Sequence, residues 1–327
     1  MFDLLRRKSA LHAAAWAASA LLLVSCGGSD TEENPAPPPI GAVSFQIGAS
    51  ITDNGNECIR TPASCPPSPP YSPGIFSNGP LWIDTVVARF GAAAVPSLKG
   101  GTNYAYAGAR TGPVPGVTGA AASTVPTLLA QFNALLLANN NRINPSALVV
   151  VDASAFGNNI RDALALIAAN PSNATTISTN VVTSGVTDVV SILNIIFNTG
   201  GRNVLVLNTP DLGKTPAVQS LGSAALAGAA TQMSAGFNGA LLQQITALRA
   251  LPGYSIQVAD AFALGAQITA NPAAFGLTNA TAPCFVPPPA GPLLCATPNT
   301  YLFWDPLHPT YAAGQLLAST ALKALGR

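Results

Sequence analysis

The sequence predicts a three-layer α/β/α domain with a parallel β-sheet of about five strands. Short apolar runs recur along the chain and alternate with longer segments whose apolar residues have helical spacing. Several of these runs are apolar at almost every position, which is typical of strands that are buried on both faces of a parallel sheet. Alternating strands and helices favour a sheet with helices on both faces. No internal repeat is visible.

The first half of the chain supplies two of the predicted strands. A short apolar run predicts a strand over residues 42–47. Apolar residues at helical spacing predict helices over 81–90 and 125–137, and the second of these has its leucines on one side. The run over 147–151 is apolar throughout and predicts a buried strand. A helix is predicted to follow over 160–169.

The second half continues the alternation. Residues 174–198 predict a long helix, and the apolar run over 203–207 predicts a buried strand. The Ala-rich segment 221–251 predicts another helix, and 255–259 a further strand. The last predicted helix covers 309–325. Proline at 309 fits its first turn, where a backbone N–H has no partner within the helix.

Composition bounds the class of protein. The chain has 327 residues, of which 49% are hydrophobic, so one domain with a sizeable core is expected. Only 8% of the residues are charged, and the formal net charge is +1. This leaves no basic surface for nucleic acid and no polybasic membrane patch. The low charge and the many Ala, Gly, Pro, Asn and Thr residues favour an exported or envelope protein.

The N-terminus has the pattern of an export signal. Basic residues at 6–8 precede an apolar run at 13–24 that is too short to span a bilayer. The run ends in Leu23-Val24-Ser25-Cys26, which resembles the signal of a bacterial lipoprotein. The resemblance implies that residues 1–25 are removed and that Cys26 is lipidated. An ordinary signal cleaved nearby and an uncleaved anchor are the alternatives.

The segment after Cys26 is polar and then proline-rich, and it has no periodicity. We expect residues 26–41 to be a tether and residues 42–327 to form the folded domain. Acyl chains on Cys26 would hold the protein on a membrane surface without a spanning helix. Gly27, in place of an aspartate, is compatible with the outer membrane by resemblance to lipoproteins. We therefore expect a lipid-anchored envelope protein, with secretion as the alternative.

Four cysteines remain after Cys26: Cys58, Cys65, Cys284 and Cys295. An even number in an exported chain predicts two disulfides, and sequence neighbours are the expected pairs among three possible connectivities. The two pairs lie in Pro-rich segments, 58–73 and 282–298, which we expect to form surface excursions that wall the entrance to the site. No metal site is expected, since the sequence has no Cys-x-x-Cys pair.

Two short segments carry the candidate chemistry. His308 is the only histidine besides His12, which lies in the predicted leader, and it follows Asp305 by three residues. A serine hydrolase needs a base with a pKa near neutrality, and histidine is the usual one. Ser50 follows the first predicted strand, where a parallel sheet opens its crevice. Alone, each segment also fits an ordinary turn or helix cap.

Five segments in this order resemble the GDSL-type (SGNH) serine hydrolases, in their branch of bacterial lipases, phospholipases and acyltransferases. The resemblance runs from about Val43 to the C-terminus, and the order and spacing of the blocks make it specific. The blocks are Gly48-Ala49-Ser50-Ile51-Thr52-Asp53-Asn54-Gly55-Asn56, Phe76-Ser77-Asn78-Gly79-Pro80-Leu81-Trp82, Asn103-Tyr104-Ala105-Tyr106-Ala107-Gly108-Ala109, Phe156-Gly157-Asn158-Asn159-Ile160 and Asp305-Pro306-Leu307-His308-Pro309-Thr310.

The resemblance implies a role for each matching residue. Ser50 would be the nucleophile, His308 the base and Asp305 the acid that orients it. The oxyanion hole would combine the backbone N–H groups of Ser50 and Gly108 with the side-chain amide of Asn158. Ala107 is the neighbouring backbone candidate. Sliding the fourth block by one position would make Asn159 the amide donor instead.

Three positions depart from the family pattern. Ala49 replaces the aspartate before the nucleophile, Phe156 replaces the first glycine of the fourth block, and Asn159 replaces an aspartate. In the family these positions support turns and perform no chemical step. Of the other acidic residues, Asp53 is expected to fix a turn, and Asp152 to cap or support a neighbouring element.

The expected function is therefore hydrolysis of carboxylic esters through an acyl-serine intermediate, without a cofactor. The branch resemblance implies fatty-acyl or phospholipid esters. A deacetylase of envelope glycans is the alternative enzyme. A non-catalytic envelope protein that keeps the fold and binds lipid or glycan is the alternative from another class. Acyl length, natural substrate and oligomeric state are not predicted.

Overall fold

A computed structural model describes residues 35–118, 123–287 and 293–327. The predicted signal over 1–25 and the predicted lipidation residue Cys26 lie outside the described residues.

The central sheet has four parallel strands in the order β1-β2-β3-β4. The strands are β1 (Ser44–Ile47), β2 (Leu148–Asp152), β3 (Asn203–Leu207) and β4 (Ser255–Ala259). All four correspond to strands that the sequence predicts, and the bounds of β3 and β4 are those predicted. In the register, Ile47 pairs with Val151, and Val151 pairs with Val206.

A segment beside β1 occupies the place of a fifth strand. The N–H of Gln46 donates to the Thr102 carbonyl at 3.2 Å, and the N–H of Tyr104 donates to the Gln46 carbonyl at 2.7 Å. Only isolated bridges form there, so the described sheet has four regular strands where about five were expected. Asn103 faces Gln46 at this edge, with one of these hydrogen bonds on either side.

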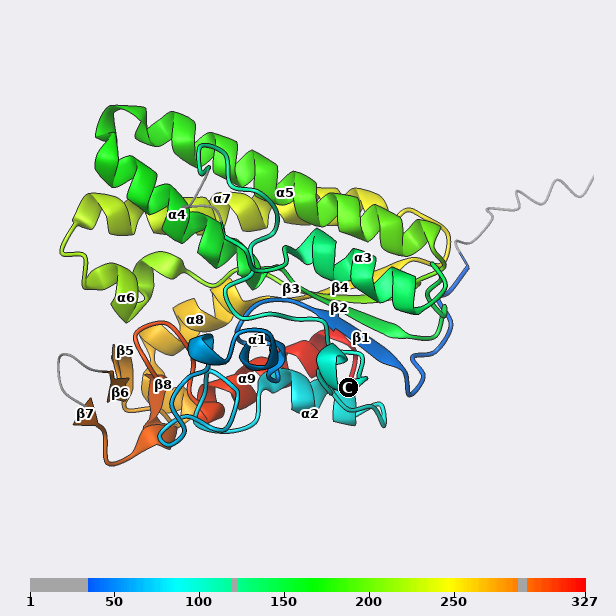
Figure 1. Ribbon diagram of the computed structural model, residues 1–327, viewed down its shortest axis with the longest axis horizontal. Coiled ribbons are helices and arrows are strands. Elements are labelled where there is room, and N and C mark those ends of the chain that lie inside the picture. The colour runs from blue at the N-terminus through cyan, green and yellow to red at the C-terminus, as the bar shows by residue number, and fades with distance from the viewer. Residues whose placement is uncertain (1–34, 119–122, 288–292) are drawn as a thin grey trace, which may run out of the picture. The chain divides into compact units, whose positions relative to one another are not determined.

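Helices cover both faces of the sheet, and Figure 1 shows the three layers. One layer contains α3, α4, α5 and α7, and the other contains α2, α8 and α9. The described helices are α1 (Asn56–Arg60), α2 (Trp82–Ala88), α3 (Leu128–Ala138), α4 (Phe156–Ala169), α5 (Ala174–Asn198), α6 (Pro216–Gln219), α7 (Ala224–Leu248), α8 (Ala261–Ala270) and α9 (Tyr311–Ala324).

Alternate residues of each strand pack into different cores. In β2, Val149 and Val151 pack with α3, α4 and α5, whereas Leu148 and Val150 pack with α2 and α9. Every residue of β2 and β3 is buried. A strand that is buried on both faces needs apolar side chains at successive positions, which explains the uninterrupted runs in the sequence.

The short helices α1 and α6 were not predicted, and helices α4 and α8 differ from the sequence prediction in ways that concern the site. Helix α4 begins at Phe156, four residues before the predicted start, although glycine and asparagine are poor helix formers. Its buried face, which includes Asn159 and Ile160, packs against α5 and α7, so tertiary packing outweighs local propensity. Helix α8 was not predicted. It begins after Asp260, whose side chain accepts a hydrogen bond from the N–H of Ala263 and caps the helix.

Both predicted disulfides are present, Cys58–Cys65 and Cys284–Cys295. Next to the second lie two small sheets, one pairing β5 (Asn279–Pro283) with β8 (Tyr301–Phe303) and the other pairing β6 (Phe285–Val286) with β7 (Leu293–Leu294). Cys284 and Phe285 pack with Tyr71 and Trp304 in a small core of their own. This core lies directly beside Asp305.

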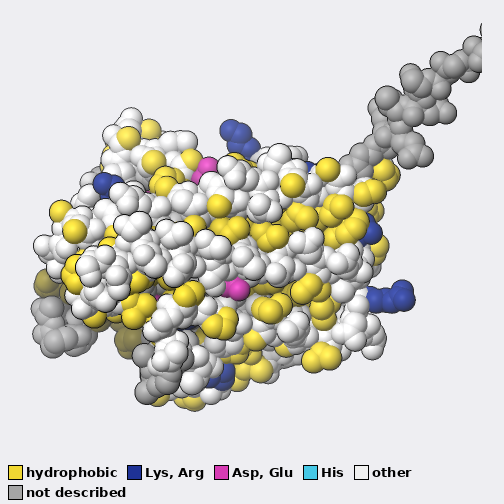
Figure 2. All heavy atoms as spheres, turned by 90° about the horizontal axis from the view of Figure 1, so that it is seen from above, with side chains coloured by type: hydrophobic (Ala, Val, Ile, Leu, Met, Phe, Trp, Pro, Cys, Tyr) yellow, Lys and Arg dark blue, Asp and Glu magenta, His cyan; other side chains and the backbone are white. Residues whose placement is uncertain are grey.

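Helix α5 belongs to a segment, 171–198, that is long and apolar enough to cross a membrane by length and composition alone. One side of α5 is buried against α3, α4 and α7, with Val181, Val189 and Ile196 among the buried residues. Figure 2, which looks onto the molecule from above Figure 1, shows hydrophobic side chains interspersed with uncharged polar ones and few charged groups. We therefore describe α5 as a packed helix of the domain.

The described chain enters the domain at the amino ends of the strands. The N–H of Gly41 donates to the Ser146 carbonyl at 2.8 Å, just before β2. The side chain of Asn203, the first residue of β3, donates to the Pro38 carbonyl at 2.9 Å. The carboxyl ends of the strands, where Ser50 follows β1, form the opposite edge of the sheet.

Candidate active site

Ser50 lies in a turn directly after β1, which ends at Ile47. The Ala49 carbonyl accepts hydrogen bonds from the N–H groups of Thr52 and Asp53, both at 3.0 Å. The turn is therefore tight, and Ser50 at its centre is only half-buried. Its hydroxyl lies at the edge of the sheet where the carboxyl ends of parallel strands form a crevice.

A buried glutamine and a buried aspartate hold the backbone ahead of the serine. Gln131 of α3 accepts from the N–H of Gly48 at 2.8 Å and donates to its carbonyl at 3.0 Å. Asp152, at the end of β2, accepts from the N–H of Ala49 at 3.3 Å and from the Thr52 hydroxyl at 2.8 Å. A Cβ at Gly48 would lie 2.6 Å from the Asp152 Cβ, so only glycine fits there. Burial raises the pKa of Asp152.

The structure brings His308 and Asp305 to this turn from the other end of the chain. His308 Nε2 lies 2.9 Å from Ser50 Oγ, and His308 Nδ1 lies 2.7 Å from Asp305 Oδ2. The other oxygen, Asp305 Oδ1, accepts from the N–H groups of Leu307 at 2.8 Å and His308 at 2.7 Å. The side chains of His308 and Asp305 are only 12% and 7% exposed. The three side chains form a continuous hydrogen-bonded chain that ends at the serine hydroxyl.

Tyr71 is a second partner of the acid. Its hydroxyl donates to Asp305 Oδ2 at 2.7 Å, the oxygen that also contacts His308. Burial alone would raise the pKa of Asp305, but the electrostatic interaction with His308 and the hydrogen bonds from His308 and Tyr71 hold that pKa below its usual value. Burial and the negative charge of Asp305 raise the pKa of Tyr71. Asp305 is therefore held as a carboxylate and Tyr71 as a neutral donor.

The segment 76–78 holds the histidine loop in place. The Phe76 ring packs against the His308 ring, with their centroids 5.0 Å apart. The Ser77 hydroxyl donates to the Pro309 carbonyl at 3.1 Å, and the Asn78 side chain accepts from the N–H of Tyr311 at 2.7 Å. These contacts give a structural reason for the second sequence block. They fix the backbone on the C-terminal side of His308.

Two backbone N–H groups near the serine are available to a ligand. Neither the N–H of Ser50 nor that of Gly108 has a hydrogen-bond partner within the described parts of the chain. The N–H of Ala107, in contrast, donates to Asp53 Oδ2 at 2.8 Å. Of the two backbone candidates considered from the sequence, the N–H of Ala107 is therefore occupied, whereas the N–H of Gly108 has no partner among the described residues. Asp53 fixes the turn, as its position in the sequence suggests.

The two candidate asparagines have different surroundings. Asn158 lines the cavity that contains Ser50, and one of its amide hydrogens is used for the Ala109 carbonyl at 2.8 Å. Asn159 is fully buried and makes two hydrogen bonds with Thr111. Because an amide nitrogen carries two hydrogens, Asn158 keeps one donor for the site. Asn159 serves to hold the 111 segment.

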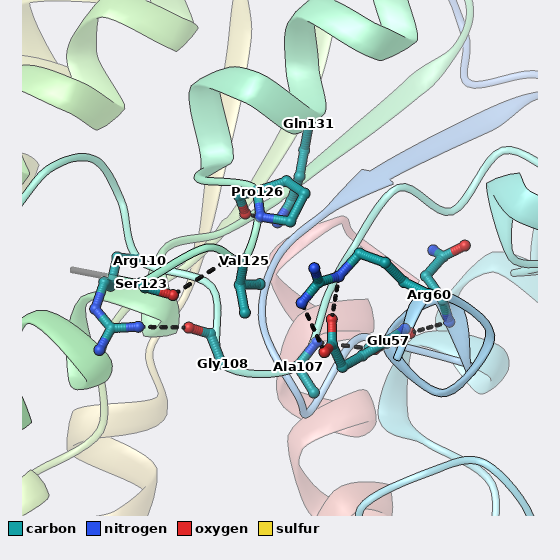
Figure 3. Close-up of polar contacts among 11 residues, drawn as sticks. Glu57, Arg60, Ala107, Gly108, Arg110, Ser123, Val125, Pro126 and Gln131 are labelled. Atoms are coloured by element: carbon teal, nitrogen blue, oxygen red, sulfur yellow. Dashed lines mark hydrogen bonds and ion pairs between the residues drawn. The ribbon is translucent and has the colours of Figure 1, made fainter. Parts of the chain in front are cut away.

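An ion pair ties the Gly108 loop to the helix that carries Asn158. Arg110 donates to both carboxylate oxygens of Asp162 in α4, at 2.5 and 2.8 Å. Arg110 also donates to the Gly108 carbonyl at 3.0 Å, and Figure 3 shows this contact beside Ala107. The carbonyl of Gly108 is thus engaged with Arg110, while its N–H makes no hydrogen bond to any residue that the structure describes. This arrangement fixes the loop before any ligand binds.

A cavity of about 450 Å³ opens beside Ser50. Its walls include Asn158, His308 and most of helix α8, and they are mainly apolar. The volume falls within the range of about 300–1,000 Å³ that is usual for small-molecule sites. No described residue of the Pro-rich segments 58–73 and 282–298 lines it, so the expectation that these segments wall the entrance is wrong for this cavity.

Charged groups at the cavity are few. Arg161 and Lys214 line it and are exposed to solvent, and Asp211 lies near them on the lining. Arg161 donates to the side-chain oxygen of Asn158 at 3.3 Å, which turns the Asn158 amide nitrogen away from Arg161. Within residues 35–118, 123–287 and 293–327, no group of three or more His, Cys, Asp or Glu side chains is placed to hold a metal ion.

Comparison with known proteins follows this geometry. The GDSL-like lipase/acylhydrolase family matches residues 45–320, which is most of the chain and includes all four strands of the central sheet except the first residue of β1. The chain belongs to this family. Membership places it among the carboxylic ester hydrolases, and the α/β/α arrangement with a parallel sheet agrees with the fold expected from the sequence blocks.

Individual relatives agree with the family. A GDSL esterase/lipase of Arabidopsis thaliana is 34% identical over 139 residues, a match that spans 38% of each chain. A second plant protein, the GDSL esterase/lipase LTL1, is 25% identical over 313 residues, 85% of this chain and 86% of the relative. A phosphatidylcholine-sterol acyltransferase of Aeromonas hydrophila is 26% identical over 242 residues, 73% of this chain and 64% of the relative.

The departures from the GDSL pattern are accommodated in the fold. Ala49 is buried in the main core, and the carboxylate of Asp152 accepts from its N–H. The ring of Phe156 is stacked on Phe237, with their centroids 4.0 Å apart. Gly185 of α5 leaves room for it, because a Cβ there would lie 2.5 Å from the Phe156 ring. The third replacement, Asn159, is held by its two hydrogen bonds with Thr111.

Three residues of the site were missed in the sequence. Tyr71 lies in a Pro-rich loop, where no spacing rule points to a contact with Asp305. Gln131 lies on α3, 83 residues from Gly48, and a single glutamine among leucines gives no signal of its partner. Gly265 lies on α8, which was not predicted. The aspartate at 260, followed by an Ala-rich segment, was the available signal of that helix.

Proposed function

We propose that this GDSL-family protein hydrolyses carboxylic esters through an acyl-serine intermediate, with Ser50 as nucleophile. The observation that carries the proposal is the chain from Asp305 through His308 to Ser50, with contacts of 2.7 and 2.9 Å. A serine, a base within hydrogen-bond reach and an acid that orients the base are the parts that acyl transfer needs.

The reaction takes place in two halves. Ser50 Oγ attacks the ester carbonyl carbon while His308 Nε2 takes the hydroxyl proton. The tetrahedral intermediate collapses, His308 gives that proton to the leaving alcohol oxygen, and the acyl group stays on Ser50. Water then attacks the acyl carbon, His308 takes its proton and returns it to Ser50 Oγ, and the carboxylic acid leaves. Asp305 keeps the Nδ1 hydrogen in place and stabilises the imidazolium.

The carbonyl oxygen becomes negative in both tetrahedral intermediates. The donors proposed for it are the N–H groups of Ser50 and Gly108 and the free amide hydrogen of Asn158. Donors that are fixed before the reaction stabilise such a charge more than mobile water does. The hydrogen bonds that hold the turn at Asp53 and the ion pair at Arg110 support this fixed arrangement.

Fatty-acyl esters are the proposed substrates. The mainly apolar cavity beside Ser50 suits a hydrocarbon chain. Phospholipids are a second candidate, favoured by the two exposed cations Arg161 and Lys214 at the cavity. The name of the Aeromonas relative, a phosphatidylcholine-sterol acyltransferase, supports this class. Lys214→Ala is expected to slow hydrolysis of an anionic phospholipid in micelles and to leave a neutral p-nitrophenyl ester unaffected.

The decisive test compares wild type with Ser50→Ala on acetyl, octanoyl and palmitoyl p-nitrophenyl esters. We expect wild type to prefer the longer acyl groups and to react with a fluorophosphonate probe, and the variant to do neither. Activity on acetyl groups alone, with acetylated glycan also hydrolysed, would favour the deacetylase. No hydrolysis by wild type, together with glycan or lipid binding that Ser50→Ala retains, would favour the non-catalytic protein.

We also propose that residues 1–25 are a signal peptide, that Cys26 carries lipid, and that residues 26–41 link it to the hydrolase domain over 42–327. The support is the Leu23-Val24-Ser25-Cys26 pattern at the end of the apolar run. The proposed location is the bacterial envelope, in the outer membrane. Cells that express Cys26→Ala should lose incorporation of labelled palmitate into the protein and should release it from the membrane fraction. Unchanged labelling would rule out Cys26 as the site.

A further inference from the structure

Helix α8 forms much of the wall of the cavity that begins at Ser50. Every residue of α8 (Ala261–Ala270) lines this cavity except Ala263 and Gln267. With about 3.6 residues per turn, these two exceptions lie one above the other on one side of the helix. Gly265 stands midway between them in sequence, so its position projects to the opposite side, at the centre of the face that lines the cavity.

Gly265 has no side chain to fill the cavity in front of it. A Cβ built at Gly265 would meet no atom within 4 Å, although the residue lines the cavity. Its backbone is helical, so a glycine is not required by conformation. Ile268 and Leu264, the neighbouring apolar side chains of α8, are engaged in a small core with Leu277 and Leu302. The space in front of Gly265 is thus available for a ligand.

We propose that Gly265 sets the length of the acyl chain that the cavity accepts, an inference that rests on the proposed ester hydrolysis. The acyl group must stay on Ser50 through both halves of the reaction, whereas the alcohol must leave after the first. A cavity that continues from the serine along an apolar helix therefore suits the acyl chain. In this arrangement the chain passes over Gly265, and any side chain at 265 would shorten the available path.

The test substitutes Gly265→Leu and measures kcat/KM for p-nitrophenyl acetate and octanoate. A buried methylene is worth about fourfold in such a ratio, so the loss of a few methylenes of space should lower the octanoate-to-acetate ratio by more than about tenfold. The measured quantity is this ratio, and not the rate with either ester alone. Gly265→Ala should give a smaller change in the same direction.

Gly239→Leu is the matched control. Gly239 also lies inside a helix, α7, it has no atom within 4 Å of a built Cβ, and it is not among the cavity residues. Both substitutions replace a helical glycine and should keep or raise Tm, because glycine is a poor helix former. A ratio that is unchanged in Gly265→Leu, or changed equally in Gly239→Leu, overturns the proposal.

Two further arms separate this inference from the proposed function. A series with a fixed acetyl group and lengthening alcohols should respond little to Gly265→Leu. If that series changes and the acyl series does not, the cavity holds the alcohol and the proposal is wrong. If wild type hydrolyses no ester, the proposed function is wrong. Binding of a fluorescent octanoic acid derivative that is weakened by Gly265→Leu only would still support the assignment of the cavity to an acyl chain. Equal binding by all variants would overturn that assignment.

Discussion

On one side of Ser50, polar side chains are fixed by hydrogen bonds, and on the other side helix α8 presents a wall of mostly small and apolar residues. The first side contains His308, Asp305 and Tyr71, with contacts of 2.7 to 2.9 Å from one group to the next. The second side offers only the shape of a cavity of about 450 Å³. The proposed chemistry thus belongs to the hydrogen-bonded side, and the proposed selection of acyl length belongs to the side of α8.

The two sides of Ser50 should therefore tolerate different kinds of amino-acid substitution. A hydrogen-bonded chain depends on individual atoms, since removing one partner leaves a buried group unsatisfied. An apolar wall depends on volume, and similar side chains can replace one another at low cost. Substitutions on the polar side should therefore change turnover of every ester, whereas those on α8 should change stability or choice of substrate.

The largest expected effect is that of His308→Ala. Turnover of acetyl and octanoyl esters should fall by about a thousandfold or more, because the Ser50 hydroxyl loses its base. Steady-state hydrolysis of both p-nitrophenyl esters measures it, with circular dichroism to show that the fold is kept. If turnover falls by tenfold or less in a folded variant, another group must act as the base. The proposed division between a catalytic side and an apolar side would then be wrong.

The second-largest loss of turnover is expected for Asn158→Ala. Loss of one oxyanion donor should lower kcat by about a hundredfold to a thousandfold for all acyl lengths, with little change in Tm. Asn159→Ala is the matched control, since Asn159 is buried and bound to Thr111. That control should instead lose about 1–3 kcal/mol of stability, measured by urea unfolding. The reverse outcome would make Asn159 the donor and shift the sequence block by one position.

Tyr71→Phe is expected to have a smaller effect on kcat, about tenfold or less, because a hydrogen bond to a charged group is worth about 1.5–3 kcal/mol and only part of it acts on the transition state. The lost hydroxyl is one of the groups that lower the pKa of Asp305, so that pKa should rise. The fall in rate that comes from protonation of Asp305, which in wild type lies below the ordinary aspartate pKa of about 3.9, should then move to higher pH. A lower kcat with an unmoved profile would indicate that Tyr71 only packs against the site.

The smallest effect is expected on the apolar side. Ile268 is a buried residue of α8 that packs against Leu277, and Ile268→Val should cost about 0.5–1.5 kcal/mol of stability. Acetyl ester turnover should not change, because no hydrogen bond of the polar side is touched. Thermal unfolding and the acetate assay measure the two quantities. If acetate turnover falls as far as in Tyr71→Phe, then α8 positions the catalytic groups and the two sides are not separate.

The same contrast explains what could be predicted from the sequence. The four strands of the sheet could be predicted because buried parallel strands need apolar residues at successive positions. The site residues Ser50, Asp305 and His308 could be predicted because they stand in short sequence blocks with a fixed order. The structure brings these three side chains together. The two disulfides also follow from the sequence, through the nearness of the cysteines in each pair.

Helix α8 and the partners Tyr71 and Gln131 could not be predicted in this way. The α8 sequence combines alanines with a central glycine and shows no clear polar face. Tyr71 reaches Asp305 over 234 positions, and a contact at that separation depends on how two loops fold against each other. The cavity beside α8 depends on small residues that leave space unfilled. Small residues have no characteristic spacing in a sequence, so the cavity could not be predicted.

Ser50 and His308 are 258 positions apart, although their side chains lie 2.9 Å from each other. During synthesis the nucleophile therefore leaves the ribosome long before its base is made. A nascent chain that lacks the last twenty or so residues, on the order of one-fifteenth of the polypeptide, carries a serine hydroxyl of ordinary reactivity. The proposed ester hydrolysis therefore requires that the segment carrying Asp305 and His308 has been synthesised and has docked against the turn of Ser50.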